Sequence, residues 1–308
     1  MRVIIVGLGI QGNKRKCIAG SDVVATVDPI AAGADYKSVE AVPAATYDAA
    51  LLCIPDEPKI QIINYLVECG KHVLVEKPLV AEDQGELEKL ADLINRKNAV
   101  CYTAYNHRFE PHFVRLKETI ESGVLGKLYR LRFFYGNGTA RDVRNSPWRD
   151  KGGGVLHDLA SHLLDTLLFV LGSIPKDLRI WSANCFENNA FDHIICGATA
   201  PVLIEFEMSL LSWRNHFVAE VYGENGSAHI ESLCKWGPST FTLRKRVLPS
   251  GRPPEESITL VKADPTWELE YGYFNNLCET GGMSNIGNDL IINLHLKNLY
   301  REAIAKEQ

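Results

Sequence analysis

The sequence has no paired cysteines and no long apolar run. Its eight cysteines are scattered over 308 residues without a C-x-x-C pair. Scattered thiols are typical of reduced cysteines in a cytosolic protein, and a zinc site needs clustered ligands, so we expect a cytoplasmic protein with no metal site. No stretch approaches the ~20 apolar residues of a membrane helix, and the run at residues 3–6 is too short for a signal peptide, so we expect no membrane partner.

The sequence also lacks an excess of basic charge. Its formal net charge is -5, and 46% of its residues are hydrophobic. Without a basic field to gather phosphates along a duplex, a nucleic-acid partner is not expected. A chain of this length and hydrophobic content buries more core than one small domain holds, so two domains are expected.

The first hundred residues alternate between short β-branched runs and segments with helical spacing. The strand-like segments are 3–6, 22–27, 49–54, 72–75 and 99–104, and the helix-like segments between them are 58–69 and 81–96. Strand, helix, strand at this pace predicts βαβ units and a doubly wound parallel sheet, which is the Rossmann architecture. We place this dinucleotide-binding domain at residues 1–106.

The rhythm changes after residue 106. We expect helices at 113–122 and 155–171, a mixed apolar and basic segment at 128–135, a polar loop at 136–154, strands at 177–185, 193–198, 202–210, 217–222 and 228–231, a surface loop at 244–256, and a closing helix at 290–305. Strands with few helices between them predict a largely antiparallel sheet. We assign residues 107–308 to a second domain for substrate binding and oligomerisation, and the closing helix is a candidate to pack back on the first domain.

Three glycines in GLGIQG have the G-x-G-x-x-G spacing and stand between a strand and a helix. Gly7 permits a tight turn, Gly9 lets the backbone approach a diphosphate, and Gly12 lets the helix pack close to the sheet. Free N–H groups and the positive end of the helix dipole then favour a diphosphate. The alternative interpretation is a tight turn without a ligand.

A carboxylate stands at the end of the second strand, where a dinucleotide fold needs an acceptor for the ribose hydroxyls. This residue is Asp28, and the chain continues with Pro29 and Ile30 rather than an arginine. A 2′-phosphate would meet a carboxylate with no cation beside it, so NAD is favoured over NADP. The alternative is that Asp28 only caps the strand end.

A lysine follows the fourth strand directly, in the stretch HVLVEKPL. Lys77 then lies at the carboxyl edge of the sheet, where ligands bind in such folds. A cation fixed there could hydrogen-bond a substrate hydroxyl and stabilise negative charge that develops on it. The alternative is an ordinary surface lysine at a strand end.

The stretch GGGVLHDLASHLLD carries a second group of reactive side chains. If it is helical from Val155, then Asp158, His162 and Asp165 stand at i, i+4 and i+7 on one face. A carboxylate near an imidazole can fix its tautomer and raise its basicity, and histidine suits the removal of an alcohol proton. The alternative is a polar helix face with packed histidines; His157 lies off this face and is interpreted as structural.

These motifs, in this order, resemble the glucose–fructose oxidoreductase / inositol dehydrogenase / MocA family. The resemblance rests on GLGIQG, Asp28, the segment GKHVLVEKPL and GGGVLHDLASHLLD, and it is clearest over residues 1–172. It implies an α/β fold, with an N-terminal Rossmann domain and a C-terminal α/β domain that has a large, mostly antiparallel open sheet. It also implies a homo-dimer or homo-tetramer.

The resemblance also implies roles for individual residues. Lys77 matches the active-site lysine that positions the substrate hydroxyl, His162 matches the acid/base, and Asp158 matches the aspartate that assists it. Lys77, Arg108, Asp158 and His162 are therefore the expected substrate-binding residues. The expected cofactor-binding residues are Gly7, Gly9, Ile10, Gln11, Gly12, Asp28, Cys53, Ile54, Pro55, Glu76, Lys77, Asn106, Trp148 and Arg149. For Asn106, Arg108, Trp148 and Arg149 the alternative is a loop anchor.

The sequence departs from the family pattern in three places. The loop after the third strand usually reads T-P-x-x-x-H, and here it is Cys53-Ile-Pro-Asp-Glu-Pro-Lys59. Ala160 stands where family members commonly have glycine. The stretch from Asp28 to Tyr47 is short, which bears on how the adenine is covered.

The resulting hypothesis is an NAD-dependent oxidoreductase that acts on a secondary alcohol of a sugar, an inositol or a nucleotide sugar. In it, Lys77 and His162 meet over one nicotinamide ring. Two alternatives stay open: a glycosidase-type hydrolase that uses NAD transiently, and a sensor without chemistry. Arg141, Arg144 and Arg149 precede the glycine run and could face a phosphate of the substrate, or they are solvated loop charges.

Overall fold

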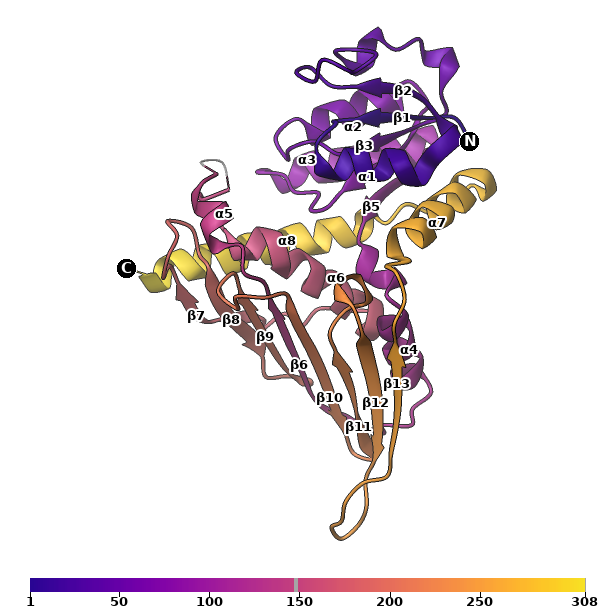
Figure 1. Cartoon of the computed structure of the whole chain (residues 1–308). Helices are drawn as coiled ribbons and strands as arrows, with labels where there is room; N and C mark the ends of the chain where they lie inside the picture. The colour runs from indigo at the N-terminus through magenta and orange to yellow at the C-terminus, as the bar shows by residue number, and fades with distance from the viewer. Residues whose placement is uncertain (147–148, 308) are drawn as a thin grey trace. The chain divides into compact units, whose positions relative to one another are not determined.

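The computed structural model describes residues 1–146 and 149–307, which divide into two compact units (Figure 1). Unit 1 consists of Met1–Asn106 and Thr266–Leu294. Unit 2 consists of His107–Pro265 and the described chain from His295 onward.

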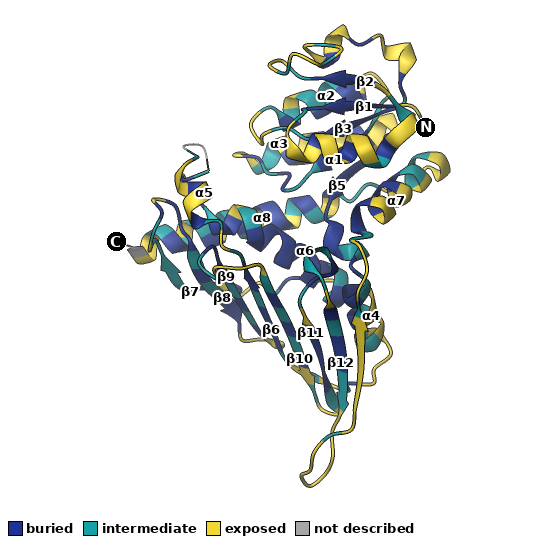
Figure 2. Ribbon diagram, in the orientation of Figure 1, coloured by how far each residue is buried: buried dark blue, intermediate teal, exposed yellow. Residues whose placement is uncertain are grey.

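Unit 1 contains a five-stranded parallel sheet in the order β2-β1-β3-β4-β5. The strands are β1 (Val3–Val6), β2 (Val23–Val27), β3 (Ala49–Leu52), β4 (His72–Glu76) and β5 (Cys101–Ala104). Every residue of β1, β3 and β5 is buried, as expected for strands covered on both faces (Figure 2). The predicted doubly wound Rossmann sheet is confirmed.

The helices of unit 1 begin and end where local signals favour it. They are α1 (Ile10–Ala19), α2 (Lys59–Glu68), α3 (Gln84–Lys97), α7 (Thr266–Thr280) and the first part of α8 (Ile286–Glu307). The sequence predicted α3 from residue 81. It begins later because the Asp83 side chain caps it, accepting a 3.0 Å hydrogen bond from the Gly85 N–H, and it ends at Asn98 in the left-handed conformation.

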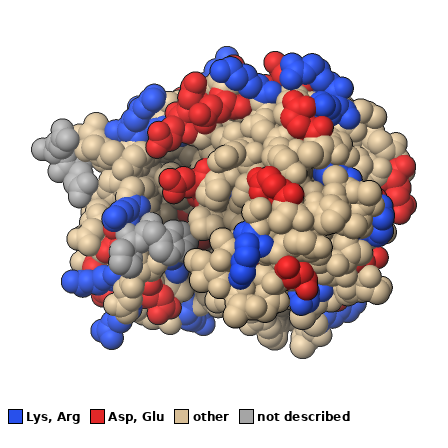
Figure 3. Space-filling view, turned by 90° about the horizontal axis from the view of Figure 1, so that it is seen from above, with Lys and Arg blue, Asp and Glu red and all other residues tan. Residues whose placement is uncertain are grey.

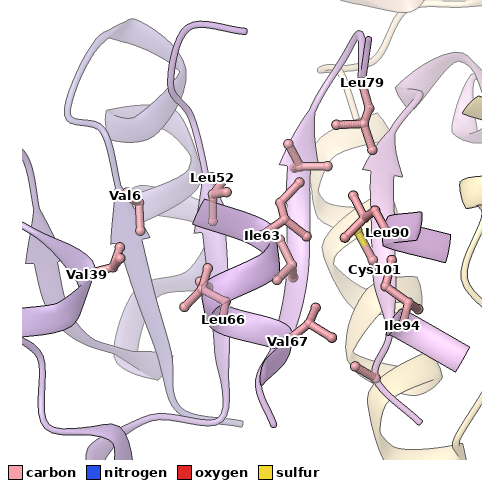
Figure 4. Close-up of a cluster of buried hydrophobic side chains, with 14 of the residues drawn as sticks. Val6, Val39, Leu52, Ile63, Leu66, Val67, Leu79, Leu90, Ile94 and Cys101 are labelled. Atoms are coloured by element: carbon pink, nitrogen blue, oxygen red, sulfur yellow. The ribbon is translucent and has the colours of Figure 1, made fainter. Parts of the chain in front are cut away.

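The core of unit 1 lies between the sheet and helices α2 and α3. Figure 4 shows side chains from both layers packed together, among them Leu52, Ile63 and Leu90. Leu79, which follows the EKP motif directly, belongs to this core and is fully buried. The chain that leaves β4 is therefore anchored two residues after Lys77.

Residues Thr266–Leu294 are part of unit 1, although the sequence analysis placed them in the second domain. The buried carboxylate of Asp289 accepts hydrogen bonds from the Thr103 hydroxyl at 2.8 Å and the Tyr105 hydroxyl at 3.1 Å. The Asn285 side chain bonds both the N–H and the carbonyl of Thr103. These polar contacts tie the returning segment to β5, and Trp267, Tyr271 and Phe274 of α7 are buried at helical spacing.

Unit 2 contains an eight-stranded sheet in the order β13-β12-β11-β10-β6-β9-β8-β7. Its strands are β6 (Leu128–Gly136), β7 (Arg179–Asn184), β8 (His193–Ala198), β9 (Leu203–Ser209), β10 (His216–Gly223), β11 (Gly226–Glu231), β12 (Ser239–Lys245) and β13 (Glu255–Leu260). Strands β6 and β9 pair in parallel and the other neighbours are antiparallel, which confirms the predicted sheet type. The predicted loop 244–256 is shorter, because Arg244 pairs with Glu255 in the β12–β13 hairpin.

One face of this sheet is apolar and carries helices α4 (Pro111–Glu121) and α6 (Ser161–Leu171) (Figures 1 and 2). Phe113 of α4 meets Phe217 of β10 there, with ring centroids 5.3 Å apart. The opposite face is charged: Arg130 and Arg132 both bond the Glu205 carboxylate at 3.0 Å. The alternation follows from the two-residue period of a strand.

The predicted helix 155–171 exists, but its first turn is wide. Leu156–Ala160 form a π-helical turn that continues into α6, which ends at Gly172 with φ +74°. Among the described residues of the predicted loop 136–154 is a short helix, α5 (Ala140–Arg144). Within the described residues, the helices are too short or too polar to cross a lipid bilayer.

Candidate functional site

At two positions of the glycine loop in unit 1, close backbone contacts leave no room for a side chain. At the third position there is no such contact. Gly7 has φ +90°, and a Cβ there would lie 2.3 Å from the carbonyl oxygen of Cys53. A Cβ on Gly12 would lie 1.8 Å from the Gly7 oxygen. A Cβ on the exposed Gly9 would meet nothing within 4 Å. Gly7 and Gly12 are thus required by the fold, whereas Gly9 leaves open backbone that a ligand can approach.

Helix α1 begins at this open backbone. The first N–H groups of a helix have no intrahelical acceptor, and Gly9 brings no side chain to cap them. Ile10 is 89% exposed and Gln11 is also exposed, so the helix start is accessible. These uncapped N–H groups lie at the positive end of a ten-residue helix, next to Gly9, where nothing lies within 4 Å of a Cβ position. Such a helix start fits a diphosphate.

Asp28 connects the end of β2 to the glycine loop. Its Oδ2 accepts the Leu8 N–H at 2.8 Å, and its Oδ1 accepts those of Ile30 and Ala31, each at 2.8 Å. The Ala31 and Leu8 N–H groups hold the pKa of this carboxyl below its usual range. A carboxylate has about four acceptor positions and three are used, so Asp28 acts as a strand-end cap and keeps capacity for one more donor.

A cation does lie in the turn after Asp28, which the sequence analysis did not expect. The Lys37 ammonium donates to the Ala31 carbonyl at 2.8 Å, and its charge contributes to the lowered pKa of Asp28. The absence of an arginine after Asp28 is therefore a weaker argument against NADP than the sequence indicated, because Lys37 is placed near the same turn.

A buried arginine holds the Glu76 side chain of the EKP motif. The fully buried Arg15 of α1 donates from Nε to the Glu76 carboxylate at 2.8 Å and from Nη2 to Glu270 at 2.6 Å. Burial opposes the charge, but Glu270 and Glu76 outweigh it and raise the pKa of Arg15. Glu76 therefore makes a structural ion pair within unit 1, and Lys77 is the partly buried residue that follows it.

The loop after β3 and the end of the first segment supply the remaining residues expected at the cofactor. Cys53, Ile54 and Pro55 follow β3 at the carboxyl edge, and burial raises the pKa of the Cys53 thiol, so it stays protonated. The Asn106 side chain donates to the Thr266 hydroxyl at 3.1 Å and is buried. Through that bond Asn106 acts as an anchor of its loop. A contact between Asn106 and a cofactor stays a prediction.

In unit 2, His162 lies in the first turn of α6 within a cluster of rings. It is 7% exposed, and its ring centroid is 4.3 Å from that of His107, with the planes 20° apart. The ring of Tyr135, on β6, lies 6.0 Å from His162. Neither His107 nor Tyr135 was among the predicted site residues. His107 lies between the expected residues Asn106 and Arg108, so its neighbours carried a signal, whereas Tyr135 lies in β6 and belongs to no recognised motif.

The two carboxylates of the long helix make separate ion pairs. Asp165 is completely buried, and Arg108 contacts both its oxygens, with Nη2 at 2.7 Å and Nε at 2.9 Å. Burial outweighs Arg108 and raises the pKa of Asp165. Asp158 is partly exposed and its carboxylate lies 3.8 Å from Arg149. The wide π turn changes the helical phase that the i, i+4, i+7 argument assumed.

The glycines before this helix serve the local fold. Gly154 has φ +49°, and a Cβ there would lie 2.2 Å from the Phe191 carbonyl oxygen, which accepts the Val155 N–H at 2.8 Å. The His157 ring is 6.1 Å from that of Tyr300. Trp148 lies outside the described residues. The ligand contacts expected of Arg108, Arg149 and Asp158 stay predictions.

A lysine missed by sequence reasoning stands beside this ring cluster. The Lys235 ammonium donates to the Tyr135 hydroxyl at 3.1 Å and lies 4.8 Å from the ring centroid of Trp236. Burial opposes its charge, but Tyr135, Asp264 and Glu110 raise the pKa of Lys235. Lys235 is therefore a fixed cation that orients the phenol next to His162.

Charged side chains and potential metal ligands are spread over the described residues. On the face drawn in Figure 3, acidic and basic side chains are interspersed. Among residues 1–146 and 149–307, no group of three or more histidine, cysteine or carboxylate side chains could hold a metal ion.

Two family descriptions match the chain. Residues 1–105 match an oxidoreductase family with an NAD-binding Rossmann fold, and residues 113–229 match the GFO/IDH/MocA C-terminal domain. An inositol 2-dehydrogenase of Rhizobium meliloti is 26% identical over 154 residues, which are 49% of this chain and 45% of that protein. Four such curated relatives are matched over 34 to 50% of their own length, so the chain spans half of them or less.

Solved structures share the fold over the whole chain. A levoglucosan dehydrogenase in complex with NADH has a TM-score of 0.84 and 17% identity, covering 99% of this chain and 97% of that one. A UDP-N-acetylglucosamine 3-dehydrogenase of Acidithiobacillus ferrooxidans has a TM-score of 0.81 and 17% identity, covering 100% and 99%. At these identities the likeness concerns the fold.

Proposed function

The chain belongs to the GFO/IDH/MocA oxidoreductase family, and on that premise we propose that it is an NAD-dependent dehydrogenase acting on a secondary alcohol of a sugar, an inositol or a nucleotide sugar. The observation that carries the proposal is the open glycine backbone at Gly9, set between two glycines that the fold requires. Relatives named as inositol and levoglucosan dehydrogenases support the substrate class.

The cofactor would be held by unit 1. Gly9, Ile10 and Gln11 would present the α1 N–H groups to the diphosphate, and the remaining acceptor capacity of Asp28 would take a ribose hydroxyl. When bound, nicotinamide adenine dinucleotide supplies a hydride acceptor. NAD is proposed over NADP because Asp28 repels a 2′-phosphate, and the nearby Lys37 makes a direct comparison of both cofactors necessary.

The proton chemistry is assigned to His162. A neutral imidazole accepts the proton of the substrate hydroxyl at a ring nitrogen, the role that histidine most often has in general base catalysis. Lys77 donates a hydrogen bond to the same substrate oxygen and stabilises its developing charge. Asp158 is assigned to orient the histidine, as the family resemblance implies.

Tyr135 is proposed to bind the substrate next to His162. Because Lys235 donates to the phenol oxygen, the O–H of Tyr135 must point to another acceptor. A substrate hydroxyl beside the one being oxidised is such an acceptor. Arg108 is a weaker candidate for substrate binding, because Asp165 already engages its guanidinium on two oxygens.

The test is a dehydrogenase assay with NAD and, separately, NADP. myo-Inositol, levoglucosan and UDP-N-acetylglucosamine are offered first, followed by a wider panel of polyols, and NADH formation is followed by absorbance. The proposal predicts stoichiometric NADH with at least one substrate. It also predicts a loss of roughly 100-fold or more in kcat for Lys77→Met and for His162→Asn. Wild-type turnover in both variants would overturn the assigned roles.

The same assay separates the other interpretations. Net hydrolysis of a glycoside without NADH accumulation would indicate a hydrolase that uses the dinucleotide transiently, and nucleotide binding without turnover would indicate a sensor. A homo-dimer or homo-tetramer is part of the proposal, to be measured by light scattering. So is a cytoplasmic location, inferred from the scattered thiols.

A further inference from the structure

A buried lysine stands on the helix that follows β3. Lys59 is the first residue of α2 and is 1% exposed. Its ammonium donates to the Asp56 carboxylate at 2.6 Å, the Glu76 carbonyl at 2.6 Å and the Pro78 carbonyl at 2.8 Å. An ammonium has three N–H donors, and all three meet an oxygen.

The two carbonyls flank Lys77. The Glu76 carbonyl belongs to the peptide that leads into Lys77, and the Pro78 carbonyl lies one residue after it, so one cation fixes the backbone on both sides. The Glu76 side chain is held separately by Arg15, and Leu79 is buried in the core. The EKP turn is therefore fixed by contacts that all lie within unit 1.

Charge makes this contact stronger than a neutral side chain would. Hydrogen bonds from an ionised donor are roughly twice as strong as neutral ones, and a buried carbonyl that loses its donor carries a desolvation cost. Burial lowers the pKa of Lys59, but the Asp56 carboxylate three residues earlier opposes this, and the three oxygen acceptors match the three N–H groups of an ammonium. A methionine at position 59 would fill much the same volume and leave both carbonyls without this donor.

We propose that Lys59 is a positioning residue for Lys77, fixing the turn that presents the Lys77 ammonium to the substrate. The proposal rests on the assignment of Lys77 in the proposed function. It also explains the departure of this loop from the T-P-x-x-x-H pattern: the terminal residue here is a lysine, and an imidazole has at most two N–H groups for the three oxygens.

The kinetic test compares Lys59→Met with Lys59→Gln in the full-length protein, using a substrate that reduces NAD in the assay above. Lys59→Met is expected to lower kcat roughly 10- to 100-fold while the Kd for NADH stays within about two-fold, because a displaced catalytic group costs rate rather than cofactor affinity. Lys59→Gln, which keeps two amide donors, should recover part of the lost rate. Wild-type kcat in Lys59→Met would overturn the proposal.

The matched control is Lys71→Met. Lys71 also donates to a backbone carbonyl, that of Tyr47 at 2.8 Å, but it precedes β4, whereas the EKP turn follows that strand. This variant is expected to keep the wild-type kcat. If Lys71→Met lowers kcat as much as Lys59→Met does, the effect is general destabilisation and the proposal fails.

Hydrogen exchange tests, without a substrate, whether Lys59 fixes the EKP turn. This hold of Lys59 on the Glu76 and Pro78 carbonyls is called the clamp. In the protein alone, amide exchange of the peptide covering residues 77–82 is expected to accelerate several-fold in Lys59→Met and to remain unchanged in Lys71→Met. Unchanged exchange in Lys59→Met would overturn the clamp whether or not the enzyme assay succeeds. Accelerated exchange in a protein that reduces no dinucleotide would instead leave the clamp intact and count against the proposed function.

Discussion

The imidazole rings of His107 and His162 are stacked, with centroids 4.3 Å apart and planes at 20°. Phe113 lies 5.3 Å from His107, again nearly parallel. His162 is 7% exposed, so packing against these neighbouring rings fixes the position of its imidazole.

Removing the stacking partner should loosen His162. His107→Ala is expected to lower the free energy of unfolding by about 2 kcal/mol, because it leaves a cavity in a buried cluster, and to lower kcat. His107→Phe keeps a ring in the stack and should lose less of both. Urea unfolding and steady-state kinetics measure the two effects, and a greater loss in His107→Phe than in His107→Ala would contradict the role of stacking.

The glycine loop predicts two different kinds of failure. Gly9→Ala should fold with a Tm near that of the wild type, because its Cβ meets nothing within 4 Å, yet bind NADH at least ten-fold more weakly, since the methyl group stands where the diphosphate approaches. Gly12→Ala should lower Tm as well, because its Cβ would lie 1.8 Å from the Gly7 oxygen. Thermal melts and NADH fluorescence titration measure both. Gly287→Ala, at an exposed position of α8 where a Cβ also meets nothing within 4 Å, is the control for NADH binding.

Asp28 predicts a pH-dependent contribution to stability. Its pKa is lowered in the folded state by the N–H groups of Ala31 and Leu8, so the ionised form stabilises the fold. The contribution is full above the unfolded pKa of about 3.9 and is lost as the pH falls through the lower folded value. Asp28→Ala should therefore be less stable than the wild type by about 1–2 kcal/mol at pH 7.

Urea unfolding of both proteins at several pH values checks this sign. The difference between wild type and Asp28→Ala should be constant between about pH 5 and 7, and it should shrink below about pH 4. A difference that grows on acidification would contradict the hydrogen-bond pattern of this carboxylate.

The Arg108–Asp165 pair predicts a large penalty for removing the cation alone. Arg108→Met leaves a completely buried carboxylate without its guanidinium, and the expected loss is about 3 kcal/mol of unfolding free energy. Adding Asp165→Asn should recover part of that loss, because the remaining group is neutral. A double-mutant cycle measures the coupling, and additive losses would show that the pair does not act as a unit.

The cysteines predict an order of chemical reactivity. Cys17 and Cys69 are exposed, whereas Cys101, Cys196 and Cys234 are buried. Burial raises the pKa of the Cys196 thiol to about 12, so this thiol stays protonated at neutral pH. Only the thiolate form of cysteine reacts readily with such reagents. A thiol reagent with mass-spectrometric mapping should label Cys17 and Cys69 first. Rapid labelling of Cys196 in the native protein would contradict its burial.

The sequence predicted most of the first unit because its signals are local. The apolar runs of β1 and β4 and the helical period of α2 can be read within ten residues. The closing helix was a candidate to pack back on the first domain, but the start of the return at Thr266 was not predicted, because it depends on contacts such as that of Asp289 with Thr103 across more than half the chain. The π turn at Leu156–Ala160 likewise has no signature in the side-chain order.

The candidate site was predicted only where a motif carried it. The motifs identified Gly9, Lys77 and His162, whose roles remain proposals. They did not identify Lys59 or Lys235, because a lysine in a sequence is by default a surface residue, and only the positions of its acceptors reveal a buried, fully bonded ammonium. Contacts between distant segments are what the sequence order leaves undetermined.

The contact between Asp28 and the Leu8 N–H has a consequence for redesigning the coenzyme preference of this chain. To make the chain accept NADP, whose ribose carries a phosphate, the first change to try is a replacement of the acidic residue after the second strand. Here the same carboxylate steadies the glycine loop through Leu8. A successful redesign would have to supply a new acceptor for that N–H in the same step. Otherwise the affinity gained at the ribose would be lost at the diphosphate, because the glycine loop would no longer be held.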